Sequence, residues 1–251
     1  MRALGAVMYR EGKIRTTNLT FVFWDLFYPL SNLLVFGVGL SHMLGTSPPG
    51  VSGDYNAFFL AGVLGMASFG IAANTSWSFF LDRDNGIFYE MLTYPLTRAQ
   101  YLLGKVLFNV AVAIAQALLT LALAAGWLGV PIAWSGLPLT IAAVSVGTAG
   151  WFFFYAIFAL RIRRNDAFNT VTSVFFVVFL FASSIFYPLD PLPFGFRFLA
   201  LANPITWQVD ILRYATIGLG SLSQIGYEAS AFLVFTLVSF ALAVRTLQKQ
   251  D

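Results

Sequence analysis

Few residues in this chain could do chemistry, and none has the partners that catalysis would need. Glycine–lysine pairs end at Lys13 and Lys105, but neither is followed by Ser or Thr, so there is no phosphate-binding loop. Ser183 and Ser184 lie in an apolar run without a histidine to activate them, which favours helix packing over nucleophilic catalysis. His42 is the only histidine and there is no cysteine, so a metal site lacks a second ligand. We therefore expect a chain that is not itself an enzyme and binds no cofactor of its own.

The composition indicates a membrane protein. Charged residues make up 10% of the chain, against about 25% in soluble domains. Hydrophobic residues make up 59% and 27 positions are Phe, more apolar surface than a soluble fold of 251 residues can bury. The apolar runs are long and lack alternation, so they predict helices in an all-α, single transmembrane domain over 1–251. The six expected membrane spans are Phe21–His42, Asn56–Phe80, Gly104–Trp127, Gly136–Leu160, Ala167–Tyr187 and Gly226–Val244.

The basic residues predict the orientation of these spans. They cluster before the first span and after the second, fourth and sixth, and basic residues stay on the cytoplasmic side. Both termini are therefore expected in the cytoplasm, and only Arg197 and Arg213 fall on the other side. The N-terminal segment lacks the features of a signal peptide, so the first span is expected to act as an uncleaved insertion signal. The clustered residues are Arg2, Arg10, Lys13, Arg15, Arg83, Arg98, Lys105, Arg161, Arg163, Arg164, Arg245 and Lys249.

Two segments on the cytoplasmic side have an amphipathic pattern. Residues 1–18 combine apolar and basic positions, which predicts a helix in the inner membrane interface, with a solvated basic tail as the alternative. In the loop 82–95, apolar positions 87, 88, 91 and 92 share one helical face. Asp84 or Asn85 can cap this helix and Pro95 can end it. Its mixed charge favours a protein partner over a helix lying on lipid.

Two further features concern the membrane interior. Asp25 lies near the cytoplasmic end of the first span, where it either pairs with a basic neighbour or belongs to a transport pathway. The segment 188–220 is too long for a turn and too apolar for a solvated loop, so it predicts two short re-entrant helices on the outer side. Asn203 is suited to cap the second of them, with Pro204 in its first turn. The middles of spans two to six hold no charged residue, so energy for transport is expected to enter elsewhere.

Taken in order, four sequence segments resemble permeases of the ABC-2 type, the membrane subunits of ATP-binding-cassette exporters for drugs, lipids and polysaccharides. The segments are YPLSNLLVFGVGL in the first span, DYNAFFLAGVLGM at the start of the second, DRDNGIFYEMLTYPLTRAQYLLGKVL after it, and FYPLDPLPFGFRFLALANPITWQVDILRY before the last.

The resemblance implies a division of labour. Two copies of this chain, as a homodimer, would form a pathway in the inner membrane of a bacterium or archaeon, and two copies of a separate ATPase would bind ATP and Mg²⁺. The loop 82–95 would be the coupling helix, with Glu90 or Asp82 meeting a basic residue of the ATPase. The implied ATPase-docking residues are Asp82, Arg83, Asp84, Ile87, Phe88, Tyr89, Glu90 and Met91, with Arg10, Lys13 and Arg15 on the interfacial helix, and the outer gate would hold Pro188, Pro193, Asn203, Pro204 and Arg213.

The exported substrate is less defined by the sequence. The 17% aromatic content suits sugar rings and membrane interfaces alike, and the fifth span is apolar enough to contact an acyl chain. We expect a lipophilic or lipid-linked molecule, with a polysaccharide as the alternative and no nucleic-acid partner. Other functional classes are a secondary transporter or channel without ATPase, a membrane-embedded enzyme, and a structural subunit of a larger membrane complex.

Overall fold

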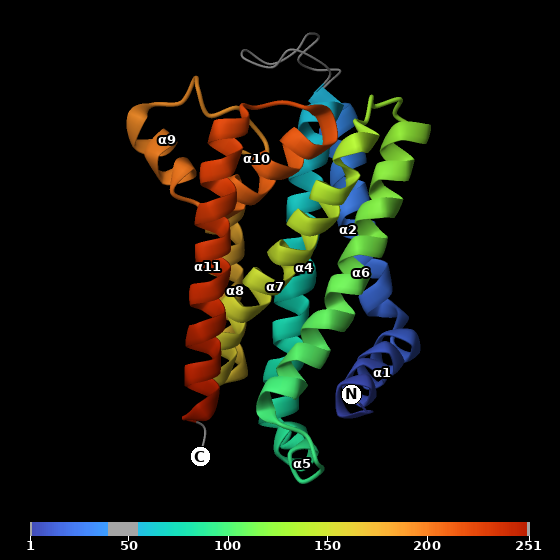
Figure 1. Cartoon of the computed structure of the whole chain (residues 1–251), viewed down its shortest axis with the longest axis vertical. Helices are drawn as coiled ribbons and strands as arrows, with labels where there is room; N and C mark the ends of the chain where they lie inside the picture. The colour runs from blue at the N-terminus through green and yellow to red at the C-terminus, as the bar shows by residue number, and fades with distance from the viewer. Residues whose placement is uncertain (1, 40–54, 250–251) are drawn as a thin grey trace.

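The computed structural model of the chain describes residues 2–39 and 55–249, and all regular structure in these ranges is helical. The expectation of an all-α fold is thereby confirmed. In chain order the elements are α1 Arg2–Thr17, α2 Leu19–Asn32, the π-helix η1 Leu33–Val38, α4 Tyr55–Asp84, α5 Ile87–Met91, α6 Arg98–Gly126, the 3₁₀ turn η2 Trp134–Gly136, α7 Leu137–Arg161, α8 Asn165–Phe181, α9 Phe194–Leu201, α10 Pro204–Ile217 and α11 Leu222–Gln248 (Figure 1).

Four of the described helices, α4, α6, α7 and α11, are long and apolar enough to cross a bilayer. Two shorter apolar helices, Phe23–Val38 and α8, fall below the roughly 20 residues of an untilted crossing. Each of the six sequence-predicted spans overlaps one of these elements. The end of the first, His42, lies outside the described residues, and the fifth was predicted to reach Tyr187 whereas α8 ends at Phe181. A helix within each of the six segments is thus confirmed, and the number of crossings stays a prediction.

The bundle has two different ends. α1, α5 and the C-terminal end of α11 lie at one end, which we call the α5 end (Figure 1). α9 and α10 lie at the other, which we call the α10 end. The two short helices expected in 188–220 are both present there. Asn203 caps α10 by accepting a hydrogen bond from the backbone N–H of Ile205, and Pro204 occupies the first turn, as the sequence predicted.

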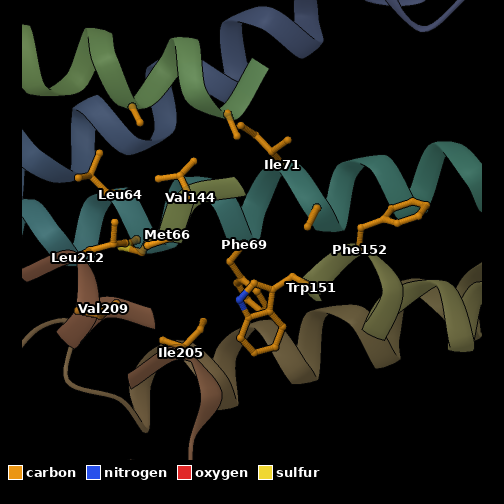
Figure 2. Packing of buried hydrophobic residues seen from close by; sticks show 14 of the residues in the cluster. Leu64, Met66, Phe69, Ile71, Val144, Trp151, Phe152, Ile205, Val209 and Leu212 are labelled. Carbon is orange, nitrogen blue, oxygen red and sulfur yellow. The ribbon is translucent and has the colours of Figure 1, made fainter. Parts of the chain in front are cut away.

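α4 forms the centre of the bundle and packs against α6, α7 and α10. Nearly all of its apolar length is buried. Figure 2 shows how Phe69 of α4, Trp151 of α7 and Ile205 of α10 gather in one apolar cluster. A polar network crosses the same core: Trp151 Nε1 donates to Gln208 Oε1 at 2.9 Å, and Gln208 Nε2 donates to Ser68 Oγ at 2.6 Å. These bonds hold the Gln208 side chain in one position against α7.

This fixed side chain makes Gly147 of α7 a sensitive position. A Cβ at Gly147 would clash with the Gln208 amide, which cannot move without breaking its bonds to Trp151 and Ser68. We expect Gly147→Ala to lower the free energy of unfolding by about 1–3 kcal/mol, measured by denaturant titration in detergent. Gly70→Ala is the matched control, because a Cβ there meets nothing within 4 Å. It should leave stability unchanged or raise it by up to about 1 kcal/mol, and equal effects at the two glycines would contradict this packing.

Candidate functional site

The segment predicted as a coupling helix over 82–95 is broken at Gly86. α4 continues through Asp84, and Gly86 then adopts a left-handed conformation with φ of 78°. Only Ile87–Met91 form α5. The helix expected to start at an Asp84 or Asn85 cap and to end at Pro95 is therefore shorter, and its N-cap is Gly86 without a side-chain hydrogen bond. Glycine tolerates the left-handed region without the steric cost that a Cβ imposes. The Asn85-Gly86 dipeptide is a turn signal that the sequence already contained.

The faces of α5 also differ from the prediction. Phe88, expected to face a partner, is fully buried in its own chain, with its ring 5.7 Å from Phe79 and 5.2 Å from Tyr101 between centroids. The neighbouring Tyr89 is 47% exposed, and Glu90 is exposed beside it. α5 is thus anchored by Phe88 and presents Tyr89 and Glu90 to the surroundings. Asp84 is exposed nearby, whereas Ile87 and Met91 are half-buried.

Asp82 lies at the centre of a buried ionic cluster. Arg10 of α1 contacts both carboxylate oxygens, at 2.5 and 3.0 Å, and Lys105 Nζ of α6 lies 2.8 Å from Oδ2. Tyr101 OH donates a further hydrogen bond to Asp82. Lys105 also contacts Glu11 Oε1 at 2.6 Å and has no exposed surface. Asp82 is thus already paired with cations of its own chain, so of the two residues expected to meet a basic residue of an ATPase, Glu90 is the one left exposed.

The cluster fixes α1 against the bundle. Burial disfavours the charge of Arg10, but the hydrogen bonds and charge of Asp82 outweigh it and raise the pKa of Arg10 above its usual value. α1 packs on α6, where Gly104 allows close approach: a Cβ there would lie 2.7 Å from Cβ of the buried Val7. Val7, one of the apolar positions in 1–18, therefore packs on α6. Lys13 alone of the three predicted basic residues is exposed.

Arg15 forms a second polar group with residues of three other helices. It pairs with Asp25 of α2 and donates to Asn109 Oδ1 of α6, and Asn74 of α4 donates to Asp25 Oδ1 at 3.1 Å. The ion pair confirms the sequence-based alternative that Asp25 pairs with a basic neighbour. Asp25 nevertheless lines two grooves, one on each side of α2.

Arg83 forms hydrogen bonds to the C-terminal end of α7. Its guanidinium donates to the carbonyl oxygens of Ala159 and Ile162, the latter at 2.5 Å, and lies 5.0 Å from the ring centroid of Phe80. A cation at a helix C-terminus satisfies carbonyls that have no intrahelical partner. Arg83 is buried in this position, which corrects the expectation that it lies on the docking surface.

Two apolar grooves flank α2. The α1 groove, of about 770 Å³, lies between α1, α2 and α6, and the α8 groove, of about 560 Å³, lies between α2, α4 and α8. Both have walls that are mostly apolar, with a few polar side chains, as expected of sites for amphiphiles. The α1 groove includes Met8, Gly12, Arg15, Phe108, Val112 and Leu119, and the α8 groove includes Trp24, Tyr28, Gly70, Asn74, Thr172 and Phe176.

At the α10 end, Arg213 is the central buried charge. It pairs with Asp210 one turn earlier, donates to the backbone oxygen of Ser184 at 2.7 Å, and lies 3.9 Å from the ring centroid of Phe58. Asn203 also donates hydrogen bonds to the backbone oxygens of Phe179 and Ala182, where α8 ends. The remaining predicted gate residues lie nearby along the chain: Pro193 directly precedes α9, Pro204 begins α10 and Pro188 lines a cavity.

The sequence analysis did not predict the roles of several charged residues in these clusters. Glu11 and Lys105 were not predicted to meet, because a pattern shows which face of one helix a residue occupies and not which other helix lies against it. For Asp210 and Arg213 a signal existed, since their spacing of three puts them on one helical face. Glu228, which lies in the cavity at the α10 end, gave no such signal.

Comparison with known proteins points to one family. The family model described as "ABC-2 type transporter" matches residues 2–217. The Cyanophora paradoxa protein named "Putative transport permease ycf38" is 24% identical over 233 residues, which cover 88% of this chain and 80% of that protein. Both findings agree with the resemblance seen in the sequence segments, and the match covers α1 through α10.

Proposed function

Because the chain belongs to the ABC-2 type transporter family, we propose that this multi-pass transport permease is the membrane subunit of an ATP-driven exporter. Two copies would form the pathway, and two copies of a separate ATPase that binds ATP and Mg²⁺ would power it. The observation that carries the proposal is α5, whose exposed Tyr89 and Glu90 are joined through buried Phe88 and Asp82 to α1, α4 and α6. A partner that moves α5 would therefore move three other helices with it.

The proposed topology has six crossings, with both termini in the cytoplasm of a bacterium or archaeon. It is supported by the basic residues, which gather at the α5 end, because such residues remain on the cytoplasmic side. α9 and α10 would then be the re-entrant pair at the outer end. The whole chain, 1–251, would act as one membrane unit, with α1 as the interfacial helix beside the ATPase.

The docking surface is revised from the sequence prediction. It would consist of Tyr89, Glu90 and Asp84, with Lys13 on the neighbouring α1, since these residues are exposed at the α5 end. An aromatic side chain beside a charge is a common composition for the centre of an interface. Asp82, Arg83 and Phe88 would act behind this surface by holding it in place.

The transport pathway is proposed along the α8 groove, between two copies of the chain. Exposed apolar side chains beside it support this, since Phe27 of α2 and Val177 of α8 are 50% and 52% exposed in the single chain. A lipophilic or lipid-linked substrate fits walls of this kind better than a polysaccharide, which needs more hydrogen-bonding groups.

The test is a pull-down of the tagged chain from its native membrane in detergent, with ATPase activity assayed on the eluate. We expect ATPase activity in the wild-type eluate and a loss of at least about tenfold for Tyr89→Ala combined with Glu90→Lys, because central interface residues contribute about 2 kcal/mol or more.

The matched control changes an exposed tyrosine and an exposed carboxylate at the α10 end, as Tyr227→Ala with Asp190→Lys, and should keep the activity. Tyr227 is 81% exposed and the Asp190 side chain 80%. An eluate free of ATPase would favour a secondary transporter, and an ATPase retained by the α5 variant but lost by the control would place the docking surface elsewhere.

A further inference from the structure

A cavity of about 460 Å³ lies at the α10 end, separate from both grooves beside α2. Its walls come from α4, the segment between α8 and α9, α9, α10 and the start of α11. Five charged side chains line it, three of them acidic: Asp190, Asp210, Glu228, Arg197 and Arg213. The remaining walls are largely apolar and include the Phe58 ring.

Four of the five charges have partners inside the chain. Arg197 contacts Asp190 at 2.9 Å, and Arg213 pairs with Asp210. The fifth, Glu228, accepts one hydrogen bond from Gln224 at its Oε1 atom, at 2.9 Å. Its other oxygen, Oε2, is buried without a hydrogen-bond partner. The residue is 8% exposed and lines the cavity.

A buried carboxylate oxygen without a partner is costly. Such groups in proteins are almost always hydrogen-bonded, and a charge removed from water needs an opposite charge or a proton. With both guanidiniums already paired, the cavity has one more carboxyl group than it has cations. A primary ammonium group would supply the missing positive charge and up to three N–H donors, and the apolar walls would cover the carbon part of the same molecule.

We infer that this cavity is a binding site for an organic ammonium group, recognised by the unpartnered oxygen of Glu228. The ammonium can belong to a lipid headgroup such as phosphatidylethanolamine or to a free organic amine. Arg213 and Asp210 shape the site and take no new charge partner. The inference does not require ATP-driven transport, so it stands or falls separately from the proposed function.

The test uses the full chain in phosphatidylcholine nanodiscs and equilibrium dialysis with two radiolabelled probes, phenethylammonium and the neutral 2-phenylethanol. Empty nanodiscs measure how much of each probe partitions into the lipid alone, and this amount is subtracted from the total bound. We expect the wild-type chain to bind the ammonium probe about tenfold tighter than the alcohol, as a hydrogen bond to a buried charge implies. Glu228→Gln should abolish this preference.

Asp166→Asn is the matched control, because this carboxylate lies outside the cavity, is exposed and is paired with Arg164. It should retain the tenfold preference. Equal binding of both probes by the wild-type chain would overturn the inference and leave a proton or a water molecule as the partner of Glu228, and this comparison decides even if Glu228→Gln fails to fold. A preference that survives in a folded Glu228→Gln chain would equally overturn it.

A second arm distinguishes the two sources of the ammonium group. The dialysis is repeated in nanodiscs that contain phosphatidylethanolamine. Weakened binding of phenethylammonium there would identify the lipid headgroup as the occupant, and unchanged binding would identify a free amine; both support the ammonium site.

Discussion

Replacing Asp82 by asparagine is expected to lower the free energy of unfolding by about 3–5 kcal/mol, since removing one member of a buried ionic cluster leaves its partners unpaired. Asp82 pairs with Arg10 and Lys105, and Lys105 has no exposed surface. Without Asp82, Glu11 still contacts both cations, and among the described residues no other acidic side chain is paired with them. The loss is a large part of the roughly 5–15 kcal/mol that holds a typical protein folded.

Denaturant titration of the purified chain in detergent measures this effect. Asp84→Asn is the matched control, because Asp84 is two residues away, exposed, and should change stability by no more than about 0.5 kcal/mol. The double variant of Asp82→Asn with Lys105→Met should cost less than the sum of the two single changes, since both members of one contact are removed. Additive costs, or an Asp82→Asn variant as stable as the control, would contradict the cluster.

The second large effect is expected at Arg213, at the opposite end of the bundle. Arg213→Met should cost about 3–5 kcal/mol, because it removes a buried guanidinium and leaves the Asp210 carboxylate, whose side chain is only 14% exposed, without its cation. It also removes the donor to the Ser184 backbone oxygen. Arg197→Met is the matched control, since Arg197 pairs with Asp190 on the surface and an exposed pair contributes about 1 kcal/mol or less.

A double-mutant cycle separates the pair from its surroundings. Arg213→Met combined with Asp210→Leu should be more stable than the sum of the single costs predicts, by about 1–3 kcal/mol, because apolar residues can replace a buried pair. Unfolding is followed by the same titration. A coupling energy near zero would mean that Arg213 is held by the Phe58 ring and the backbone carbonyl, and not by Asp210.

The helices were largely predictable from the sequence because their causes are local. The N-terminal pattern over 1–18 became Arg2–Thr17, and Asn203-Pro204 began α10 as capping chemistry requires. The main error in secondary structure was also local. The helix in 82–95 was expected to begin at an Asp84 or Asn85 cap and to end at Pro95, but it begins after Gly86 in a left-handed conformation and ends at Met91.

The clusters were not predictable, because each joins residues far apart in the sequence. Arg10 and Asp82 lie 72 positions apart, and Lys105 and Glu11 lie 94 apart. An amphipathic pattern says that Phe88 lies on an apolar face, but not whether its own chain or a partner covers that face. In this fold α4 and α6 cover it, so the exposed part of α5 is narrower than the pattern indicated.

The two ends of the molecule therefore have different roles in our account. At the α5 end, buried charges couple a small exposed surface to three helices, which suits the transmission of movement from an ATPase. At the α10 end, Arg213 and Asp210 hold short helices around a charged cavity, which suits the binding of a small ligand. The α8 groove lies between the two ends, on the side of α2 away from α1.

The most direct test of the central claim is site-specific photo-crosslinking in intact native membranes, which avoids the loss of weak partners in detergent. Benzoylphenylalanine is placed at Tyr89 and, as the control, at Trp127, which follows α6 at the α10 end and is 70% exposed. The account predicts a crosslink from position 89 to an ATPase that carries a phosphate-binding loop, and none from position 127. No ATPase crosslink at 89, or one at 127, would contradict an ATP-driven permease that docks through α5.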